Sequence, residues 1–444
     1  MKSPVLLRAL TIAAIAFAIL LPILLIKGKV SERQARAEAV VQQFAAETSR
    51  PQVVAGPFLA ATCEETFVEE RQVMRGGKAE TISESKTGRC PTVFFTPKVL
   101  KATAAMPVES RHRGIYPIRL YHADLQLTGE FEWPAPPAPH GINPRAWKRL
   151  YVVTAISDAR GIKAVSASLT QALLAPVDDK VLAQFSIRED LGEFATRQPG
   201  IRLPFAYKLG IVGTSSLQIA PVGDVTEIRI ASDWAHPSFT EAWTPDERRI
   251  GPDGFEATWR MTSVATGGEA AWSALASTEK LNGARVAAGV SLFDPINIYS
   301  LSYRATEYAF LFVLFTFGAL ALAEAMAGIR LHPVQYALTG CAIAVFFLLL
   351  IALSEHVPFA EAYGSASIAC IALLTYYLRH PLRSLARTSA FFALFVALYG
   401  SLYGLLKSED NALLMGSLMV FALLAVGMIA TRRIDWAATT PKPA

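Results

Sequence analysis

The distribution of apolar residues constrains this chain more than any other feature of its sequence. Six apolar runs each reach the length of about 20 residues that a helix needs to cross a bilayer. The first run lies near the N-terminus and five follow in the last third, whereas residues 30–300 have the mixed composition of a water-soluble segment. We therefore predict one large soluble domain inserted into a six-helix membrane protein. The apolar runs are 9–26, 308–328, 335–353, 361–378, 389–406 and 411–430.

Composition and charge agree with this division. The 444 residues are 52% hydrophobic and 18% charged, while soluble domains carry about 25% charged residues. The net charge of +5 includes no long basic tract, so we expect no nucleic-acid partner. The first run has no small-residue cleavage site after Ile26 and is longer than the apolar core of a signal peptide. We therefore expect it to remain as an anchor.

Basic residues in the short loops predict the orientation, because cytoplasmic loops carry an excess of Lys and Arg. With a cytoplasmic N-terminus, the inner loops contain Arg330, several Arg of 379–387, and Arg432, while the outer short loops contain only Lys407. A basic cluster directly after the first run opposes this orientation. Its members are Lys27, Lys29, Arg33 and Arg36. Three loops agree against one cluster, so we predict that both termini are cytoplasmic and that the large domain lies in the periplasm.

The large domain carries the pattern of a β protein. Residues 30–47 are rich in Ala, Glu, Gln and Arg and predict a helical stalk that extends the first span. After Pro51, short alternating runs such as 214–220 and 225–231 are separated by Gly, Pro and Asp. The Pro-rich segment 133–144 predicts a loop. We expect a sandwich-like, mostly antiparallel β domain.

Two cysteines of this domain are predicted to form a disulfide. Gly76 and Gly77 lie between Arg75 and Lys78, and a Gly-Gly pair suits a two-residue hairpin turn. If Arg75 faces Lys78, the same register brings Cys63 opposite Cys90. Directly opposed residues have Cα atoms about 4.5–5.5 Å apart, which is within disulfide range. The alternative is two unpaired thiols in an irregular loop. Cys341 and Cys370 lie in apolar runs and are read as small apolar residues.

Ionisable residues at the ends of the spans are the candidates for function, because charge near a bilayer is costly. One set, which we call the outer belt, falls at the predicted outer ends of the helices. These carboxylates and one histidine could bind a cation or relay protons. Alternatively, Arg304 and His356 neutralise the acids and close the bundle, and we favour this structural reading. The outer belt consists of Arg304, Glu307, Glu355, His356, Glu361, Glu409 and Asp410.

Other sites are less strongly indicated. Near the inner end of the second run, Glu324 is expected to pair with Arg330 or another cation of the inner face. The chain lacks the His-Glu-x-x-His spacing of a zinc protease, so we expect no metal site. It also lacks a phosphate-binding Gly-Lys-Ser/Thr loop, a Gly-x-Ser-x-Gly elbow and a Cys-x-x-Cys pair. We therefore expect neither enzymatic activity nor a cofactor.

These features divide the chain into six parts. They are a cytoplasmic N-terminus (1–8), a transmembrane anchor (9–26), a helical stalk (27–50), a periplasmic β-rich domain (51–305), a five-helix transmembrane bundle (306–430) and a cytoplasmic tail (431–444).

Several stretches of this sequence resemble the CreD family of inner-membrane proteins, also called cell envelope integrity proteins. In the helical part they are 303–308, 332–336, 353–356, 402–410 and 431–436, and in the large domain they are 234–239 and 254–259. The resemblance spans the anchor, the domain and the five later helices, but the first half of the domain, with both cysteines, matches poorly. It implies a Gram-negative inner-membrane protein, produced under envelope stress, that affects envelope integrity. It implies no settled biochemical activity.

Three functions remain open from the sequence. In the leading hypothesis, the β domain binds an unidentified periplasmic partner, such as a protein, a lipid or a peptidoglycan fragment, and the helices anchor it in the lipid bilayer. The second is a transporter or flippase that uses the outer belt. Against it, the spans show neither clear internal repeats nor the Gly/Pro breaks common in transporters. The third is an intramembrane enzyme using Glu355 and His356, which would require a cleft around the histidine.

Overall fold

The computed structural model describes residues 4–75, 78–167, 177–193, 200–240, 242–276, 287–292, 298–327, 331–408 and 412–432. The chain divides into two compact units. Met1–Ala39 with Ile296–Ala444 forms the helical unit, and Val40–Pro295 forms the β unit. One helix, α1 (Pro4–Glu47), runs from the first unit into the second. The anchor and the expected stalk are thus a single element, as the run of helix-forming residues after Lys29 predicts.

The helical unit contains α1 and the helices of the C-terminal third. After α5 (Ile298–Glu307), a turn at Tyr308 leads into α6 (Ala309–Ala327). The later helices are α7 (Pro333–Ser354), α8 (Phe359–Leu382), α9 (Leu385–Lys407) and α10 (Ala412–Thr431). Within the described residues, five helical segments are long and apolar enough to cross a membrane. The sixth predicted span forms α10, which is not among the five.

The boundary between the units differs from the one expected at residue 305. The structure assigns the chain from Ile296 onward to the helical unit, so α5 belongs there. This helix is amphipathic, with Tyr299, Ser302 and Ala305 buried and Glu307 exposed. Its polar residues hide it from a search for long apolar runs, because such a search measures average hydropathy and not the pattern around a helix.

The described strands of the β unit form two sheets. The first has seven strands in the order β12 (Pro237–Phe239), β15 (Ala288–Leu292), β10 (Ser216–Ile219), β1 (Gln52–Arg75), β6 (Arg145–Ile156) and β8 (Ile187–Glu193), with β2 (Lys78–Phe95) on β1. The second has eight, in the order β13 (Glu247–Gly251), β14 (Gly254–Thr262), β11 (Val225–Ser232), β3 (Val99–Ala105), β5 (Tyr116–Glu132), β9 (Arg202–Thr214) and β7 (Ile162–Ala167), with β4 (Val108–Arg113) on β5.

The described strand pairs are antiparallel except for β1 with β10 and β3 with β11. One hydrophobic cluster draws buried side chains from both sheets, including Phe58 and Val153 from the first and Leu125 and Ile230 from the second. The predicted division into a large β-rich domain and several apolar helices is confirmed. The expected strand at 225–231 is β11, and the expected run at 214–220 contains β10. These two strands lie in different sheets.

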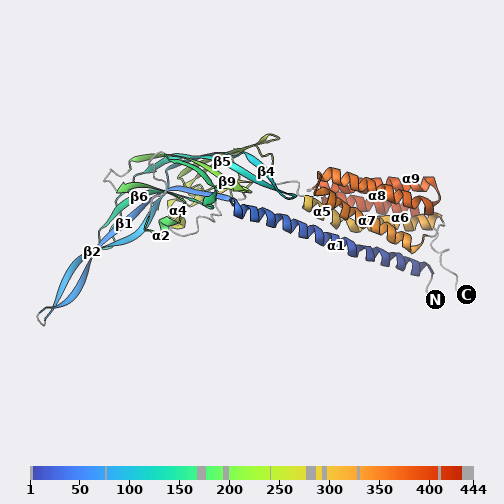
Figure 1. Ribbon diagram of the computed structural model, residues 1–444, viewed down its shortest axis with the longest axis horizontal. Coiled ribbons are helices and arrows are strands. Elements are labelled where there is room, and N and C mark those ends of the chain that lie inside the picture. The colour runs from blue at the N-terminus through green and yellow to red at the C-terminus, as the bar shows by residue number, and fades with distance from the viewer. Residues whose placement is uncertain are drawn as a thin grey trace. The chain divides into compact units, whose positions relative to one another are not determined.

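The hairpin of β1 and β2 extends beyond the rest of its sheet (Figure 1). From Val54 to Glu65, β1 also pairs with β6. Farther along, residues 66–75 of β1 and 78–87 of β2 pair only with each other in the described part of the chain. We call this two-stranded segment the arm. At about 3.3 Å per residue, its ten paired positions reach about 33 Å.

Candidate functional site

Two outer-belt acids lie next to cations of α1. The Lys27 Nζ atom is 3.1 Å from the Glu307 Oε1 atom, and it also lies 4.5 Å from the ring centroid of Tyr303 in α5. The Arg33 guanidinium is 3.7 Å from Glu355 at the end of α7, and the Tyr299 hydroxyl donates a 3.4 Å hydrogen bond to the same carboxylate. The Glu355 side chain is only 9% exposed, so its charge needs these partners.

Three of the remaining outer-belt residues, Arg304, His356 and Glu361, lie in the part of the chain that the structure describes. The exposed His356 ring bonds back to the carbonyl oxygen of Ala352, with its Nδ1 atom at 3.1 Å. Arg304 is half-buried in α5, and Glu361 is exposed in the first turn of α8. Glu409 and Asp410 lie outside the described residues. We expected Arg304 and His356 to neutralise the belt. In the structure the His356 ring bonds to backbone, and α1 supplies cations to Glu307 and Glu355.

A third contact of α1 lies at the opposite end of the helices. Arg8 forms an ion pair with Glu324, the acid that we expected to bind an inner-face cation. Glu324 also accepts hydrogen bonds of 3.1 Å from the Leu331 backbone N–H and from the Tyr336 hydroxyl. Its side chain is 11% exposed. This carboxylate therefore joins α1, α6 and the start of α7.

The positions of these contacts match the thickness of a membrane. A helical rise of 1.5 Å per residue separates Arg8 from Lys27 by about 28 Å, close to the roughly 30 Å of a hydrocarbon core. The pairs therefore suit the two edges of a bilayer, with apolar packing between them. Near the middle, the buried Ile19 packs over Gly340 of α7, where an added Cβ would lie 2.6 Å from the Ile19 Cγ1 atom.

Chemically, this arrangement favours attachment over catalysis. Glu307, Glu355 and Glu324 each have a cation from α1 beside them, and the described residues contain no group of three or more His, Cys, Asp or Glu that could hold a metal ion. In the sequence, Lys27 and Arg33 stand out only as exceptions to the orientation rule. Their position at the depth of the belt acids was the signal that could have identified them as its partners.

A second candidate site lies in the β unit at the base of the arm. Arg75 pairs with Lys78 and Cys63 pairs with Cys90, which is the register expected from the turn. The two sulfur atoms form a disulfide, with Cα atoms 5.0 Å apart. Directly inward of Cys63, the pairing of β1 shifts against both β2 and β6. The disulfide thus lies where the regular sheet gives way to the arm.

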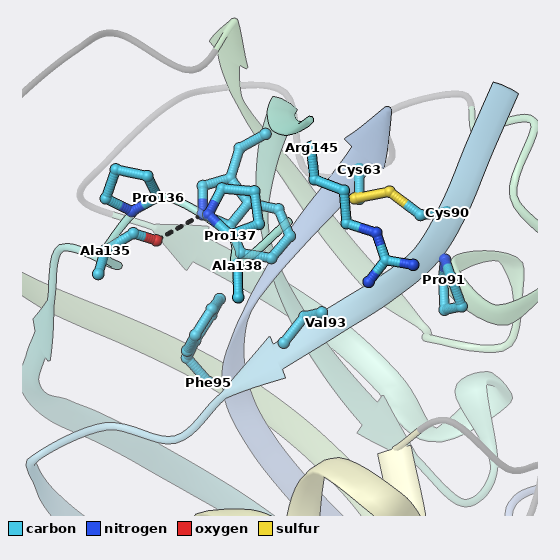
Figure 2. Close-up of a pocket in the computed structure, with 11 residues that line it drawn as sticks. Cys63, Cys90, Pro91, Val93, Phe95, Ala135, Pro136, Pro137, Ala138 and Arg145 are labelled. Atoms are coloured by element: carbon cyan, nitrogen blue, oxygen red, sulfur yellow. Dashed lines mark hydrogen bonds between the residues drawn. A yellow bond between two sulfur atoms is a disulfide. The ribbon is translucent and has the colours of Figure 1, made fainter. Parts of the chain in front are cut away.

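The disulfide lines a groove on the surface of the β unit (Figure 2). The groove has a volume of about 460 Å³ and is mostly apolar. Phe95 and Trp147 meet edge to face across it, with centroids 6.0 Å apart, and the Trp147 indole N–H donates to the Ala135 carbonyl. The groove is lined by Cys63, Cys90, Pro91, Val93 and Phe95, by the loop residues Ala135, Pro136, Pro137 and Ala138, and by Arg145 and Trp147.

One carboxylate fixes the loop and the arginine of this groove. Glu65 accepts hydrogen bonds from Asn143 at 3.0 Å and from the Arg145 Nε at 2.8 Å, and the His140 ring nitrogen lies 3.1 Å away. The hydrogen bonds from Asn143 and Arg145, with a smaller contribution from His140, lower the pKa of Glu65 to about 2. The carboxylate is therefore ionised at neutral pH and holds the Pro-rich loop against the base of the arm.

Comparisons with known proteins cover both units. The family model described as inner membrane protein CreD matches residues 4–437. The inner membrane protein CreD of Escherichia coli (strain K12) is 30% identical over 447 residues, which cover 98% of this chain and 94% of that protein. The match therefore includes α1, the β unit and the C-terminal helices. The chain belongs to the CreD family of inner membrane proteins.

Proposed function

We propose that this chain is an envelope-integrity protein of a Gram-negative inner membrane, active under envelope stress, whose β unit binds a partner in the periplasm. It crosses the membrane six times, with α10 as the sixth span, and keeps both termini in the cytoplasm. The two sheets of the β unit pack as a sandwich, and the helices serve as its anchor. The protein catalyses no reaction and needs no cofactor.

The observation that carries this proposal is the arm. Four apolar side chains on it are exposed to solvent, at 36% for Phe67, 62% for Val68, 36% for Val73 and 45% for Ile82. By the alternation of side chains along a strand, Phe67, Val73 and Ile82 lie on one face of the arm and Val68 lies on the other, so a bound molecule could cover apolar side chains on either face. The open edges of both strands also carry backbone groups that an extended partner segment could pair with.

The helical unit supports the same proposal. Helix α1 places a cation beside Glu307, Glu355 and Glu324, so these carboxylates are already compensated within the chain. Ion pairs of this kind are worth little when exposed but prevent a buried charge from standing alone. The alternative, a transporter or flippase that uses the outer belt, would need these acids to be free for a cargo.

Complementation under envelope stress separates the two functions. In a deletion strain, Val68→Ser combined with Ile82→Ser should reduce survival while the amount of membrane-inserted protein stays normal, because only the binding surface changes. Val264→Ser is the matched control, since Val264 is an equally apolar residue, 92% exposed, that lies outside the arm.

The outer belt is tested in the same strain with Glu355→Gln, His356→Ala, Glu409→Gln and Arg304→Ala. We expect survival of these variants to follow protein level. Loss of survival at normal protein level in the belt variants, together with normal survival of the arm variant, would favour transport and reject partner binding through the arm.

A further inference from the structure

Because of its position, the disulfide covalently links the two strands of the hairpin at the base of the arm. On its outer side, residues 66–75 and 78–87 have no strand partner except each other within the described chain. A two-stranded ribbon without a third strand is marginally stable in water. On its inner side, β1 is held by β6 as well as β2. Cys63 and Cys90 therefore cross-link the hairpin two residue pairs before the pairing of β1 with β6 ends at Glu65.

The same disulfide faces a groove and not the core of the unit. Both cysteines are among its lining residues, and the volume of about 460 Å³ is large enough for a small molecule or a short segment of polypeptide. The main core cluster, by contrast, does not include either cysteine. Both cysteines are buried, at 5% and 9% exposed, so the groove that they line is the route by which a reagent would approach the sulfur atoms in the folded unit.

Arg145 provides the charge that thiol chemistry needs there. The nucleophile in disulfide exchange is a thiolate, and a sulfur also leaves as a thiolate. Arg145 lines the same groove as the two cysteines, and Figure 2 shows its side chain there. Glu65 fixes it through the 2.8 Å bond to Nε. Glu65 offsets part of this charge, but the guanidinium N–H groups that Glu65 does not bind can still donate charge-assisted hydrogen bonds to an approaching or departing thiolate in the groove.

From this geometry we propose that the groove is the entry site for a dithiol that reduces the Cys63–Cys90 disulfide and releases the arm. One thiolate of the dithiol attacks a cysteine sulfur, forming a mixed disulfide and expelling the other cysteine as a thiolate, which takes up a proton. The second thiol of the dithiol then loses its proton and attacks the dithiol sulfur in the mixed disulfide. The cysteine bound there leaves as a thiolate and takes up a proton. The reagent ends as a disulfide, and the chain gains two thiols.

The first test measures reduction in the folded protein. The purified full-length chain in detergent is incubated with dithiothreitol at neutral pH without denaturant, and new thiols are counted by the mass added by a maleimide. We expect both thiols to appear, and Ala138→Trp, which narrows the groove, to slow the reaction about tenfold because exchange depends on access to the sulfur. Ala146→Trp is the control, because Ala146 is also exposed but does not line the groove.

The second test measures the arm itself. Trypsin can cleave after Arg71 and Lys86, which both lie in the arm. Reduction should raise the cleavage rate there by more than about tenfold, because a cross-link that constrains this segment is lost. A Cys63→Ser, Cys90→Ser double variant should show the fast rate with or without the dithiol.

Either of two results overturns the inference. Thiols that appear only after denaturant is added would make the disulfide inaccessible, and an unchanged cleavage rate in fully reduced protein would show that the bond does not hold the arm. Both readouts are independent of survival under stress, so they can fail while the proposed partner binding stands.

Discussion

Glu307 and Glu355 each lie beside a cation that is distant in sequence. Lys27 and Glu307 are separated by 280 positions, and no local pattern links two residues so far apart. The disulfide is the opposite case. Cys63 and Cys90 are 27 positions apart on one hairpin, and they share the register that pairs Arg75 with Lys78. Pairing could be predicted from sequence where a turn sets it, but not where tertiary packing sets it.

Asp158 makes stability of the β unit depend on pH. Its carboxylate binds the Arg160 side chain at 2.9 and 2.6 Å and accepts the Arg50 backbone N–H at 3.1 Å, at the junction between α1 and β1. The hydrogen bonds from the Arg160 side chain, together with these backbone N–H groups, lower the pKa of Asp158 to about 2. An Asp in an unfolded chain has a pKa of about 3.9. The ionised form is therefore favoured in the folded state.

We predict that this contribution is present above about pH 4 and is lost as pH falls through 2, because the folded-state pKa is the lower one. Melting temperatures of the purified chain at pH 5 and pH 2.5 test this. Asp158→Asn should melt lower than the parent at pH 5 and show a smaller drop on acidification. Asp253→Asn, in the exposed turn before β14, is the control. An equal acid-induced drop in the parent and in Asp158→Asn would contradict the prediction.

Among whole elements, α1 shows how apolar runs predict a helix but not its neighbours. The apolar run at 9–26 was enough to predict the anchor helix. The contacts of that helix depend on single positions, such as Ile19 against Gly340, which average hydropathy does not reveal. The α5 helix shows the limit at the other extreme. Its residues alternate in polarity around the helix, so it was assigned to the β domain although it belongs to the helical unit.

The contact between α1 and α7 can be tested by enlarging the side chain on α7 and then shortening the facing side chain on α1. Gly340→Ala places a Cβ 2.6 Å from Ile19, and overpacking of this kind costs about 1–3 kcal/mol. We expect a lower melting temperature in detergent for Gly340→Ala, and recovery when Ile19→Ala is added. Gly364→Ala in α8 is the matched control, since no atom lies within 4 Å of its added Cβ. Failure of the double variant to recover would mean that Gly340 matters for a reason other than packing on Ile19.

Considered as a whole molecule, the chain was divided correctly into apolar helices and a β-rich unit because hydropathy averages over many residues. The order of the strands could not be predicted, since β1 pairs with β10 and β3 pairs with β11 across more than a hundred residues of chain. Lys27 and Arg33, which the orientation rule counts as misplaced, form ion pairs that hold α1 against the other helices.

We predict that the large domain is periplasmic, and cysteine labelling in whole cells tests this. Ser83→Cys on the arm should react with a membrane-impermeant maleimide in cells whose outer membrane alone is permeable. Ser384→Cys, in the turn between α8 and α9, should react only after the inner membrane is opened. The reverse labelling pattern would mean that the large domain lies in the cytoplasm. Labelling of both sites in cells with an intact inner membrane would mean that the maleimide had crossed that membrane.

The pairing along the arm has a consequence for how its length can change over evolution. Every position from Arg75 and Lys78 back to Cys63 and Cys90 is matched one to one. A single inserted or deleted residue on one strand would turn one side of the ribbon over and separate the two sulfurs. Relatives that keep both cysteines should therefore lengthen or shorten this segment only by even numbers of residues, half on each strand. In such relatives the length of the arm would change in steps of one residue pair, while the disulfide at its base would keep the same position in the sheet.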